Sequence, residues 1–199
     1  MHYLIAPKAE TGKLPIGCHV VADGESLSFE EPWSFGEPQI LRVADDAALE
    51  HAKAALAGSE AFAVEGLIES GPGAAFVIAA HLMRDIERFK PYAAAIPGVV
   101  QSFNGQFIAR AGKVTPIAGS FVPDRAVLIE FPTAADAVAF YFSEVYAPLL
   151  KLRLETTDPR FVLVAPADSR KAPAPTSRKG LGPLAERLAC HPVPETNRI

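Results

Sequence analysis

Apolar and polar positions between residues 75 and 166 follow two periods that alternate in a regular order. Runs of consecutive apolar residues, each the length of a strand, alternate with segments whose apolar residues lie three or four positions apart, the spacing of a helix face. The strands are predicted at 75–82, 106–110, 114–117, 126–131 and 161–164, and the helices at 85–100 and after residue 133. Ala111 and Gly112 are expected to turn the second strand into the third as a hairpin.

Particular residues indicate where the two predicted helices begin, end or are interrupted. Pro97 is expected to end or bend the first helix near its last turn. Asn104-Gly105 supplies residues that tolerate the left-handed conformation with which a chain leaves a helix. Thr133 has a hydroxyl oxygen that can accept a backbone N–H at the start of the second helix. Pro148 interrupts that helix, so two helical pieces are expected to meet near Ala147.

This order of elements predicts an α+β fold, a ferredoxin-like sandwich. Two β-α-β units with right-handed crossovers place both helices on the same face of the sheet. The other face stays bare, and such a face is larger than the apolar patches that soluble monomers usually expose. At about 25 cal/mol per Å², covering it contributes several kcal/mol. We therefore expect this face to pair with a second sheet.

Composition divides the chain into three segments. Residues 1–70 form an N-terminal α+β segment, and Gly71-Pro72-Gly73 indicates a linker. The sandwich occupies residues 74–166. Residues 167–199 carry many prolines and scattered charges with little apolar content, so a flexible, disordered tail is predicted.

The N-terminal segment repeats features of the sandwich when it is shifted so that Ile40 falls on Leu128. The shift lays residues 17–24 on 105–112 and 40–43 on 128–131, with a helix at 45–56 and a last strand at 60–68. Residues 8–15 are too short and too broken to form the first helix of the sandwich. Two interpretations stay open. The segment is a degenerate, half-sandwich-like second ferredoxin-like unit that covers the bare face within one chain, or it is an unrelated cap and two whole chains pair.

Charge and hydropathy narrow the class of protein. The net charge of −4, with 49% hydrophobic and 21% charged residues, is that of an ordinary globular protein. No basic stripe interleaved with aromatic residues occurs, which argues against nucleic acid as a partner. Apolar runs fall short of the ~20 residues that span a bilayer, and the first residues do not resemble a signal peptide. We expect a cytoplasmic protein without a membrane partner.

Several segments in the middle of the chain carry a family resemblance. They are Ala75-Phe76-Val77-Ile78, Tyr92–Pro97, Asn104–Arg110, Val127–Pro132, Tyr141–Tyr146 and Leu152-Arg153. Together they resemble the domain of unknown function 1330 family over roughly residues 75–166. The resemblance implies the dimeric α/β-barrel superfamily, in which two sheets face each other around a cavity. The expected partner is therefore the protein itself, as a homodimer or as an intramolecular pseudo-dimer.

The resemblance does not imply an activity, because the family has no agreed one. The chain also departs from the family pattern in two places. The family usually has two glycines where Asn104-Gly105 stands, and an acidic residue before the glycine where Ala118-Gly119 stands. Any function that depends on that acidic residue is in doubt here.

Three residues are candidates for chemistry at a pocket. His81 lies at the end of the first predicted strand, and Glu130 stands in an otherwise apolar strand. Either could act as a catalytic base, and their alternatives are a satisfied histidine at a strand end and a carboxylate paired with an arginine. Arg110, which matches an arginine of the family, could bind a substrate carboxylate with its planar fork or form a surface ion pair.

Three further residues are candidates for substrate binding. Tyr146 matches the family and could line the pocket or pack in the core. Arg153 also matches it, and could reach the pocket mouth or bond the last carbonyls of a helix. Asn104 could contact a ligand or end a helix. No metal-ligand spacing, phosphate-binding loop or dinucleotide fingerprint occurs, so no metal or cofactor is predicted.

Three hypotheses for the function remain. In the first, a small apolar or aromatic molecule binds between facing sheets, in a cavity rimmed by Arg110, His81 and Tyr146. In the second, the protein is a cofactor-independent oxygenase or isomerase for aromatic or polyketide-like substrates. In the third, it is a non-catalytic assembly module. A cavity above ~300 Å³ favours the first two, and a sheet interface filled with side chains favours the third.

Overall fold

The computed structural model describes residues 1–8, 14–30, 36–71 and 75–165, which form ten strands and four helices. In chain order these are β1 (His2–Pro7), β2 (Cys18–Ala22), β3 (Glu25–Ser28), β4 (Pro38–Val43), α1 (Asp46–Ala55), β5 (Ala61–Glu65), β6 (Ala75–Met83), α2 (Ile86–Ser102), β7 (Gln106–Arg110), β8 (Val114–Ala118), β9 (Arg125–Phe131), α3 (Ala134–Tyr141), α4 (Ala147–Thr156) and β10 (Thr157–Ala165). The predicted tail at 167–199, and Pro72 and Gly73 of the predicted linker, lie outside the described residues.

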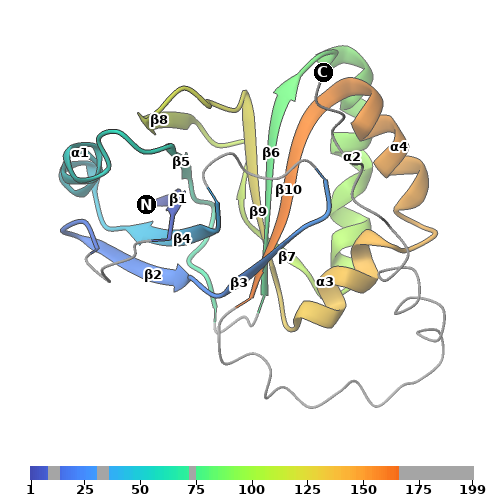
Figure 1. Cartoon of the computed structure of the whole chain (residues 1–199). Helices are drawn as coiled ribbons and strands as arrows, with labels where there is room; N and C mark the ends of the chain where they lie inside the picture. Colours follow the sequence, from blue (N-terminus) through green and yellow to red (C-terminus); the bar gives the residue numbers. More distant parts are fainter. Residues whose placement is uncertain (9–13, 31–35, 72–74, 166–199) are drawn as a thin grey trace, which may run out of the picture.

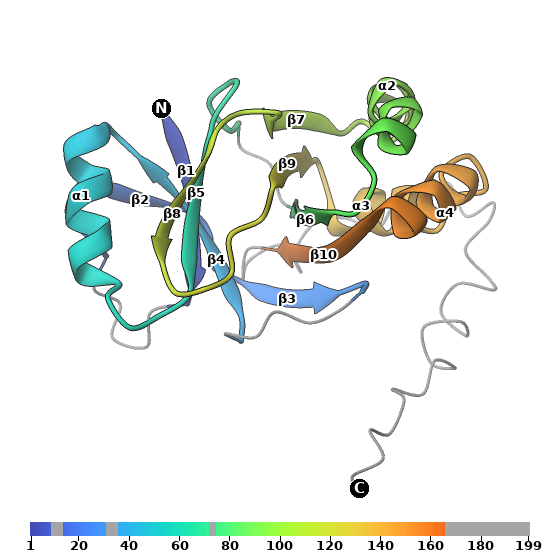
Figure 2. The same ribbon diagram turned by 90° about the horizontal axis from the view of Figure 1, so that it is seen from above.

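The strands form two five-stranded antiparallel sheets. The first sheet has the order β2-β4-β1-β5-β8 and the second the order β3-β10-β6-β9-β7. Figures 1 and 2 show four layers: α1, the first sheet, the second sheet, and a layer with α2, α3 and α4. None of the described helices is long and apolar enough to cross a membrane.

The two sheets pack face to face on one apolar core. The first sheet contributes Tyr3, Ile5, Ile40, Phe62 and Val64, and the second contributes Phe76, Ile78, Ala80, Leu128 and Val162. All ten of these side chains are buried. The face of the second sheet that the helices leave open is therefore covered by the first sheet of the same chain, whose strands other than β8 come from the N-terminal segment.

The central position of β6 in the second sheet explains its long run of apolar residues. Successive side chains of a strand point to opposite faces. Ala75, Val77 and Ala79 pack toward the helices, whereas Phe76 and Ile78 pack toward the first sheet. Both faces of this central strand are covered, so neither needs polar residues.

Pro97 was expected to end or to bend the first helix near its last turn, and helix α2 passes through it, so this proline does not end the helix. The helix continues to Ser102 with Pro91 and Pro97 inside it. A proline at position 97 has no N–H for the carbonyl four residues earlier, on Ala93. The Nη2 atom of Arg110 donates a hydrogen bond to that carbonyl over 2.5 Å. A side chain from β7 thus satisfies the backbone acceptor that Pro97 leaves open.

The expected break in the second helical segment is confirmed. Helix α3 ends at Tyr141 and α4 begins at Ala147, with Pro148 in its first turn. The predicted cap at Thr133 is also confirmed, because its hydroxyl accepts the backbone N–H of Asp136 over 3.1 Å. Both pieces pack on the outer face of the second sheet (Figure 2).

The predicted hairpin of residues 106–110 and 114–117 is wrong. Strand β7 pairs with β9 in the second sheet, whereas β8 pairs with β5 in the first. The chain turns a corner from one sheet to the other instead of folding back. Ala111 has a φ of 57°, and a Cβ on Gly112 would lie 2.5 Å from the carbonyl oxygen of Glu65. The turn residues serve this corner and its close contact with β5.

Strand β3 makes the reciprocal move from the N-terminal segment. It follows β2 of the first sheet and pairs with β10 at the edge of the second. Ser28 of β3 pairs with Val162, and Pro116 of β8 pairs with Phe62. Each half of the chain therefore gives one edge strand to the sheet of the other half.

The two sheets share one internal order, and their three central strands share one register. The first sheet contains the order β5-β1-β4-β2 and the second the order β10-β6-β9-β7. Each strand of the first order has a counterpart at the same position in the second. The matched partners are Ile5 with Ile40 and Phe62 in the first sheet, and Ile78 with Leu128 and Val162 in the second. The shift that lays Ile40 on Leu128 also lays Ser28 on Pro116. The shift therefore relates strands that take equivalent places in the two sheets, although the pairing of β2 with β4 and that of β7 with β9 differ by one residue.

Candidate functional site

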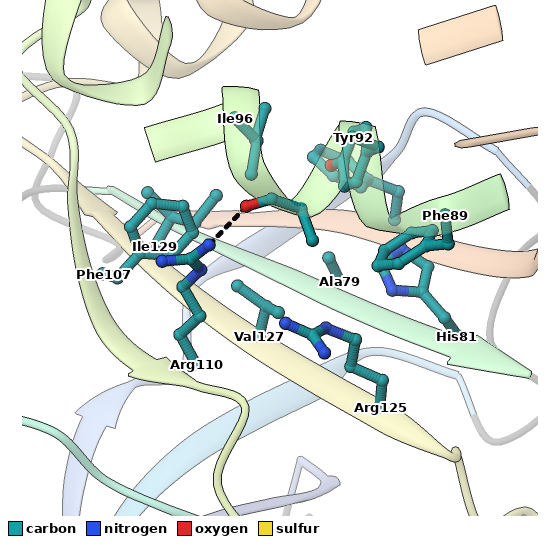
Figure 3. A pocket seen from close by; sticks show the side chains of 12 residues that line it. Ala79, His81, Phe89, Tyr92, Ile96, Phe107, Arg110, Arg125, Val127 and Ile129 are labelled. Atoms are coloured by element: carbon teal, nitrogen blue, oxygen red, sulfur yellow. Dashed lines mark hydrogen bonds between the residues drawn. The ribbon is translucent and has the colours of Figure 1, made fainter. Parts of the chain in front are cut away.

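A small cavity lies between α2 and the helix-facing side of the second sheet (Figure 3). Its volume is about 20 Å³, which is room for roughly one water molecule. Aromatic rings form much of its wall, from Phe89, Tyr92, Phe107 and Phe161. Three polar side chains, His81, Arg110 and Arg125, share this wall.

Strand geometry brings the three polar residues together. His81 lies near the end of β6, and its cross-strand partner on β9 is Arg125. Both side chains therefore point to the helix side of the sheet. Arg110 ends β7, and its guanidinium reaches α2 through the bond to Ala93 (Figure 3). Strands β6, β9 and β7 thus each place one polar side chain on the part of the sheet that α2 covers.

The two arginines of the cavity have no acidic partner within salt-bridge distance in the described part of the chain. The guanidinium of Arg125 lies 5.5 Å from the ring centre of Phe89, and that of Arg110 lies 5.1 Å from the ring centre of Phe107. Burial, followed by the charge of Arg110, lowers the pKa of Arg125. The site therefore concentrates positive charge beside aromatic rings without a carboxylate in the cavity wall.

Behind the cavity lies a buried ion pair between Arg153 of α4 and Glu30. The Nη1 atom of Arg153 donates to Oε2 of Glu30 over 3.0 Å, and Nη2 donates to Oε1. The Nε atom donates to the hydroxyl of Tyr146 over 2.9 Å. The guanidinium is fully buried and lies 4.6 Å from the ring centre of Phe161. Such bidentate pairing fixes the plane of the guanidinium.

The charges and phenols of this network stay in fixed protonation states. Burial lowers the pKa of Arg153, but the groups around it, with the hydrogen bonds and charge of Glu30 among them, outweigh burial and raise the pKa above its usual value. Burial also raises the pKa of Tyr146 and of Tyr92, whose hydroxyl oxygens lie 3.5 Å apart. The phenols therefore remain protonated, and Arg153 remains a cation.

Sequence reasoning missed two functional candidates, Arg125 of the cavity wall and Glu30. Glu30 follows β3 and accepts a third hydrogen bond, from the hydroxyl of Tyr141 over 2.9 Å. Nothing around it in the sequence indicates a buried carboxylate. Its place depends on the insertion of β3 beside β10, which no local pattern predicts.

His81 joins the buried network to the cavity. Its Nε2 atom lies 3.4 Å from Nη1 of Arg153. In the described residues, Nδ1 of His81 is the one buried side-chain nitrogen or oxygen without a hydrogen-bond partner. Burial, and then the charges of Arg153 and Arg125, hold the pKa of His81 well below its usual value. The imidazole is therefore neutral.

Of the remaining predicted site residues, two lie in the buried network beside the cavity and two lie away from it. Tyr146 and Arg153 belong to the buried network, so Arg153 is not at a pocket mouth. Asn104 lies just after α2 with a φ of 59°, in the left-handed conformation of a helix-ending residue. Glu130 points to the opposite side of the sheet from His81, where its Oε2 accepts hydrogen bonds from Gln106 and from the backbone of Gly71. The two candidate bases do not share a site.

The cavity also lies elsewhere than expected. A space between the facing sheets was predicted, but there the described apolar side chains form a continuous core. In the same residues, no group of three or more His, Cys, Asp or Glu side chains is placed to hold a metal ion. The site can therefore be described by its arginines, its imidazole and its aromatic wall.

Comparison with known families places the cavity within one domain. Residues 74–167 match the family described as domain of unknown function (DUF1330). The chain carries a DUF1330 domain. Every residue that lines the cavity lies within this DUF1330 domain, whereas Glu30, the partner of Arg153, lies outside it.

Other known proteins add little. No curated protein matches the chain. One solved structure, described as "structure of a major regulator of staphylococcal pathogenesis", is 11% identical with a TM-score of 0.38. The match covers 72% of this chain and 85% of the other. A likeness this weak carries no argument about fold or function.

Proposed function

We propose that this protein binds a small organic anion with an apolar or aromatic body in the cavity beneath α2. The observation that carries the proposal is the pair Arg110 and Arg125, which have no acidic partner in the described residues and flank a cavity walled by aromatic rings. A guanidinium binds a carboxylate through two parallel hydrogen bonds. The rings would hold the apolar part of the ligand.

Binding would require the cavity to open. Its present volume of about 20 Å³ is far below the ~300 Å³ of a pocket for a drug-sized ligand. Arg110 and Arg125 are both partly exposed, so they form the side of the cavity nearest to solvent. Displacement of these two side chains by a carboxylate is the simplest route of entry, because the ligand then neutralises the groups that it moves.

The test compares carboxylates with neutral amides of the same shape. Benzoate and phenylacetate should raise the midpoint of thermal unfolding, and benzamide and phenylacetamide should not. Arg125→Gln should weaken carboxylate binding about tenfold or more, the loss expected for a charged hydrogen bond. Arg160→Gln is the matched control, since Arg160 stacks on Phe121 away from the cavity. Equal stabilisation by acid and amide would contradict the proposal.

Catalysis is the second candidate, favoured by the neutral His81 with an unpartnered nitrogen beside the cavity. The class would be a cofactor-independent isomerase, or an oxygenase that uses molecular oxygen, for aromatic or polyketide-like substrates. Turnover by the intact protein on a panel of such compounds tests it. Loss of turnover in His81→Gln with carboxylate binding retained would support catalysis. Absence of turnover on the whole panel would leave binding as the better account.

We also propose that the second sheet and its helices form a ferredoxin-like sandwich of the dimeric α/β-barrel type. Its strand order β10-β6-β9-β7, with helices in the connections from β6 to β7 and from β9 to β10, supports this assignment. The matched register of the first sheet supports an N-terminal segment that is a degenerate second unit. The chain would then be a pseudo-dimer whose facing sheets serve assembly.

The solution mass tests the pseudo-dimer. An intramolecular partner for the second sheet leaves no need for a second chain, so light scattering should give the mass of one chain at micromolar concentration. A stable mass of two chains would instead favour a homodimer that pairs through another surface. It would contradict the proposal that the internal partner makes a second chain unnecessary.

A further inference from the structure

A continuous line of contacts joins the N-terminal segment to the cavity of the DUF1330 domain. It runs from the carboxylate of Glu30 to the guanidinium of Arg153, and from there to the imidazole of His81. Arg153 is fully buried, and His81 is 1% exposed. Glu30 is therefore the outermost member of a buried chain whose other end forms part of the cavity wall.

The contact between Arg153 and His81 restricts the imidazole to one tautomer. An arginine side chain only donates hydrogen bonds. The Nε2 atom of His81, 3.4 Å from Nη1 of Arg153, must therefore act as the acceptor. A neutral imidazole with its lone pair on Nε2 carries its proton on Nδ1. The unpartnered Nδ1 is then an N–H donor rather than an acceptor.

Glu30 determines the orientation of the donor. Both terminal nitrogens of Arg153 bond its carboxylate, and Nε bonds Tyr146. With these three bonds in place, Nη1 presents its second hydrogen toward His81. Without the carboxylate, no described acidic group fixes the rotation of the guanidinium. The distance from Glu30 to the imidazole is bridged by a single rigid, planar group.

We infer that Glu30 is a positioning residue for the cavity, and that through Arg153 it sets His81 to present an Nδ1–H donor to the ligand. The three nitrogen-bearing side chains of the cavity wall, Arg110, Arg125 and His81, then offer donors only. The ligand end that meets them must be rich in acceptors, as a carboxylate is, and it cannot be an ammonium or another donor. This preference for a carboxylate rests on the proposed function, whereas the tautomer does not.

The tautomer can be measured without a ligand. Long-range proton–nitrogen NMR correlations on protein labelled with ¹⁵N-histidine distinguish a protonated ring nitrogen from an unprotonated one, and His81→Gln assigns the signal. We expect Nδ1 to be protonated and Nε2 to be unprotonated in the intact protein. A proton on Nε2 would overturn the inference.

The double variant Glu30→Gln, Arg153→Met removes the whole Glu30–Arg153 pair without leaving a buried charge unpaired, and so tests whether this pair sets the tautomer of His81. Removal of both charges is tolerated far better than removal of one, so the fold should be retained. His81 should then lose its single tautomer and show a mixture or a proton on Nε2. The matched control is Arg88→Met with Glu155→Gln, the exposed pair of α2 and α4, which should leave the His81 signals unchanged. An unchanged tautomer in the first double variant would overturn the positioning role.

Titration with benzoate separates this inference from the proposed function. The proton on Nδ1 should shift on binding, and His81→Phe should weaken the affinity by about tenfold, the effect of one lost hydrogen bond. Benzoate that binds without moving the Nδ1 signal would overturn the donor role of His81. If no carboxylate binds while the tautomer responds to the double variant as expected, the proposed function fails and the positioning of His81 by the Glu30–Arg153 pair is supported.

Discussion

At the scale of single residues, His81 is the point where the fold restricts chemistry most. It is enclosed between Arg153, Arg125 and the ring of Phe89, 6.0 Å away between ring centres. A proton on this imidazole would add a third positive charge to a buried site. The native protein therefore excludes the protonated form, and this exclusion makes stability depend on pH.

Acidification should destabilise the protein through His81. In the unfolded chain a histidine binds a proton near pH 6.5, whereas burial and the two arginines keep the native pKa well below that value. Below about pH 6.5 the unfolded state takes up the proton and the native state does not. The free energy of unfolding should then fall by up to about 1.4 kcal/mol per pH unit until the native pKa is reached.

Urea unfolding between about pH 7.5 and about pH 5.5 measures this slope. His81→Gln should flatten it, because the glutamine does not titrate. His51→Gln, which replaces an exposed histidine of α1, should leave it as in the native sequence. A slope that survives unchanged in His81→Gln would show that other groups carry the acid sensitivity.

Sequence reasoning singled out some of the residues that the structure brings together at this site, and missed others. His81 was singled out by its place at a strand end, and Arg110, Tyr146 and Arg153 by resemblance. Glu30 could not be found in this way, since its partner lies more than a hundred positions away and the two meet only after β3 joins β10. Long-range pairing of a single carboxylate leaves no periodic pattern in the sequence.

At the scale of elements, α2 depends on a strand for one of its own hydrogen bonds. The bond from Arg110 to the carbonyl of Ala93 replaces the one that Pro97 cannot make. Arg110→Met should therefore cost about 1 kcal/mol, the usual effect of a lost hydrogen bond. In a Pro97→Ala background the helix regains its own N–H donor, and the cost of Arg110→Met should be smaller.

A double-mutant cycle in urea measures this coupling. Arg125→Met provides the comparison, because Arg125 lines the same cavity without bonding Ala93. Its cost should be the same with proline or alanine at position 97. Independent, additive effects of Arg110→Met and Pro97→Ala would mean that another group satisfies the carbonyl.

The corners between the sheets show why helices were easier to predict than strand partners. Helix periodicity and caps are local, and α1, α3 and α4 appeared where expected. Ala111-Gly112 carries the residues of a hairpin turn, yet those same residues also suit a chain that turns a corner. Whether the chain forms a hairpin or a corner depends on β5, because β8 pairs with the edge of β5. That edge belongs to a distant part of the chain.

Two glycine substitutions should shift stability in opposite directions. A Cβ on Gly112 would lie 2.5 Å from the backbone oxygen of Glu65, whereas one on Gly98 in α2 would meet no atom within 4 Å. Gly112→Ala should cost about 1–3 kcal/mol through a forced backbone shift. Gly98→Ala should add about 0.5–1 kcal/mol, because alanine favours the helix. Equal effects in thermal or urea unfolding would argue against a tight corner at β8.

At the scale of the whole molecule, the two halves exchange strands and share one core. The segment 72–199 alone would lack β3 at the edge of β10, the first sheet over its open face, and Glu30 beside Arg153. It would therefore expose an apolar sheet face and leave a buried cation unpaired. We expect this fragment to aggregate or to pair with a second copy, and not to persist as a soluble monomer.

Addition of the fragment 1–71 should supply all three missing parts. The two fragments should then assemble with one copy of each, and the complex should unfold cooperatively. Glu30→Gln in the shorter fragment should weaken this assembly, because the buried guanidinium remains unpaired. Glu50→Gln is the control, since among the described residues Glu50 forms one ion pair, with Lys53 at the surface of α1. A monomeric 72–199 fragment with a cooperative transition of its own would show that the second sheet needs no cover, and would end the case for an internal partner.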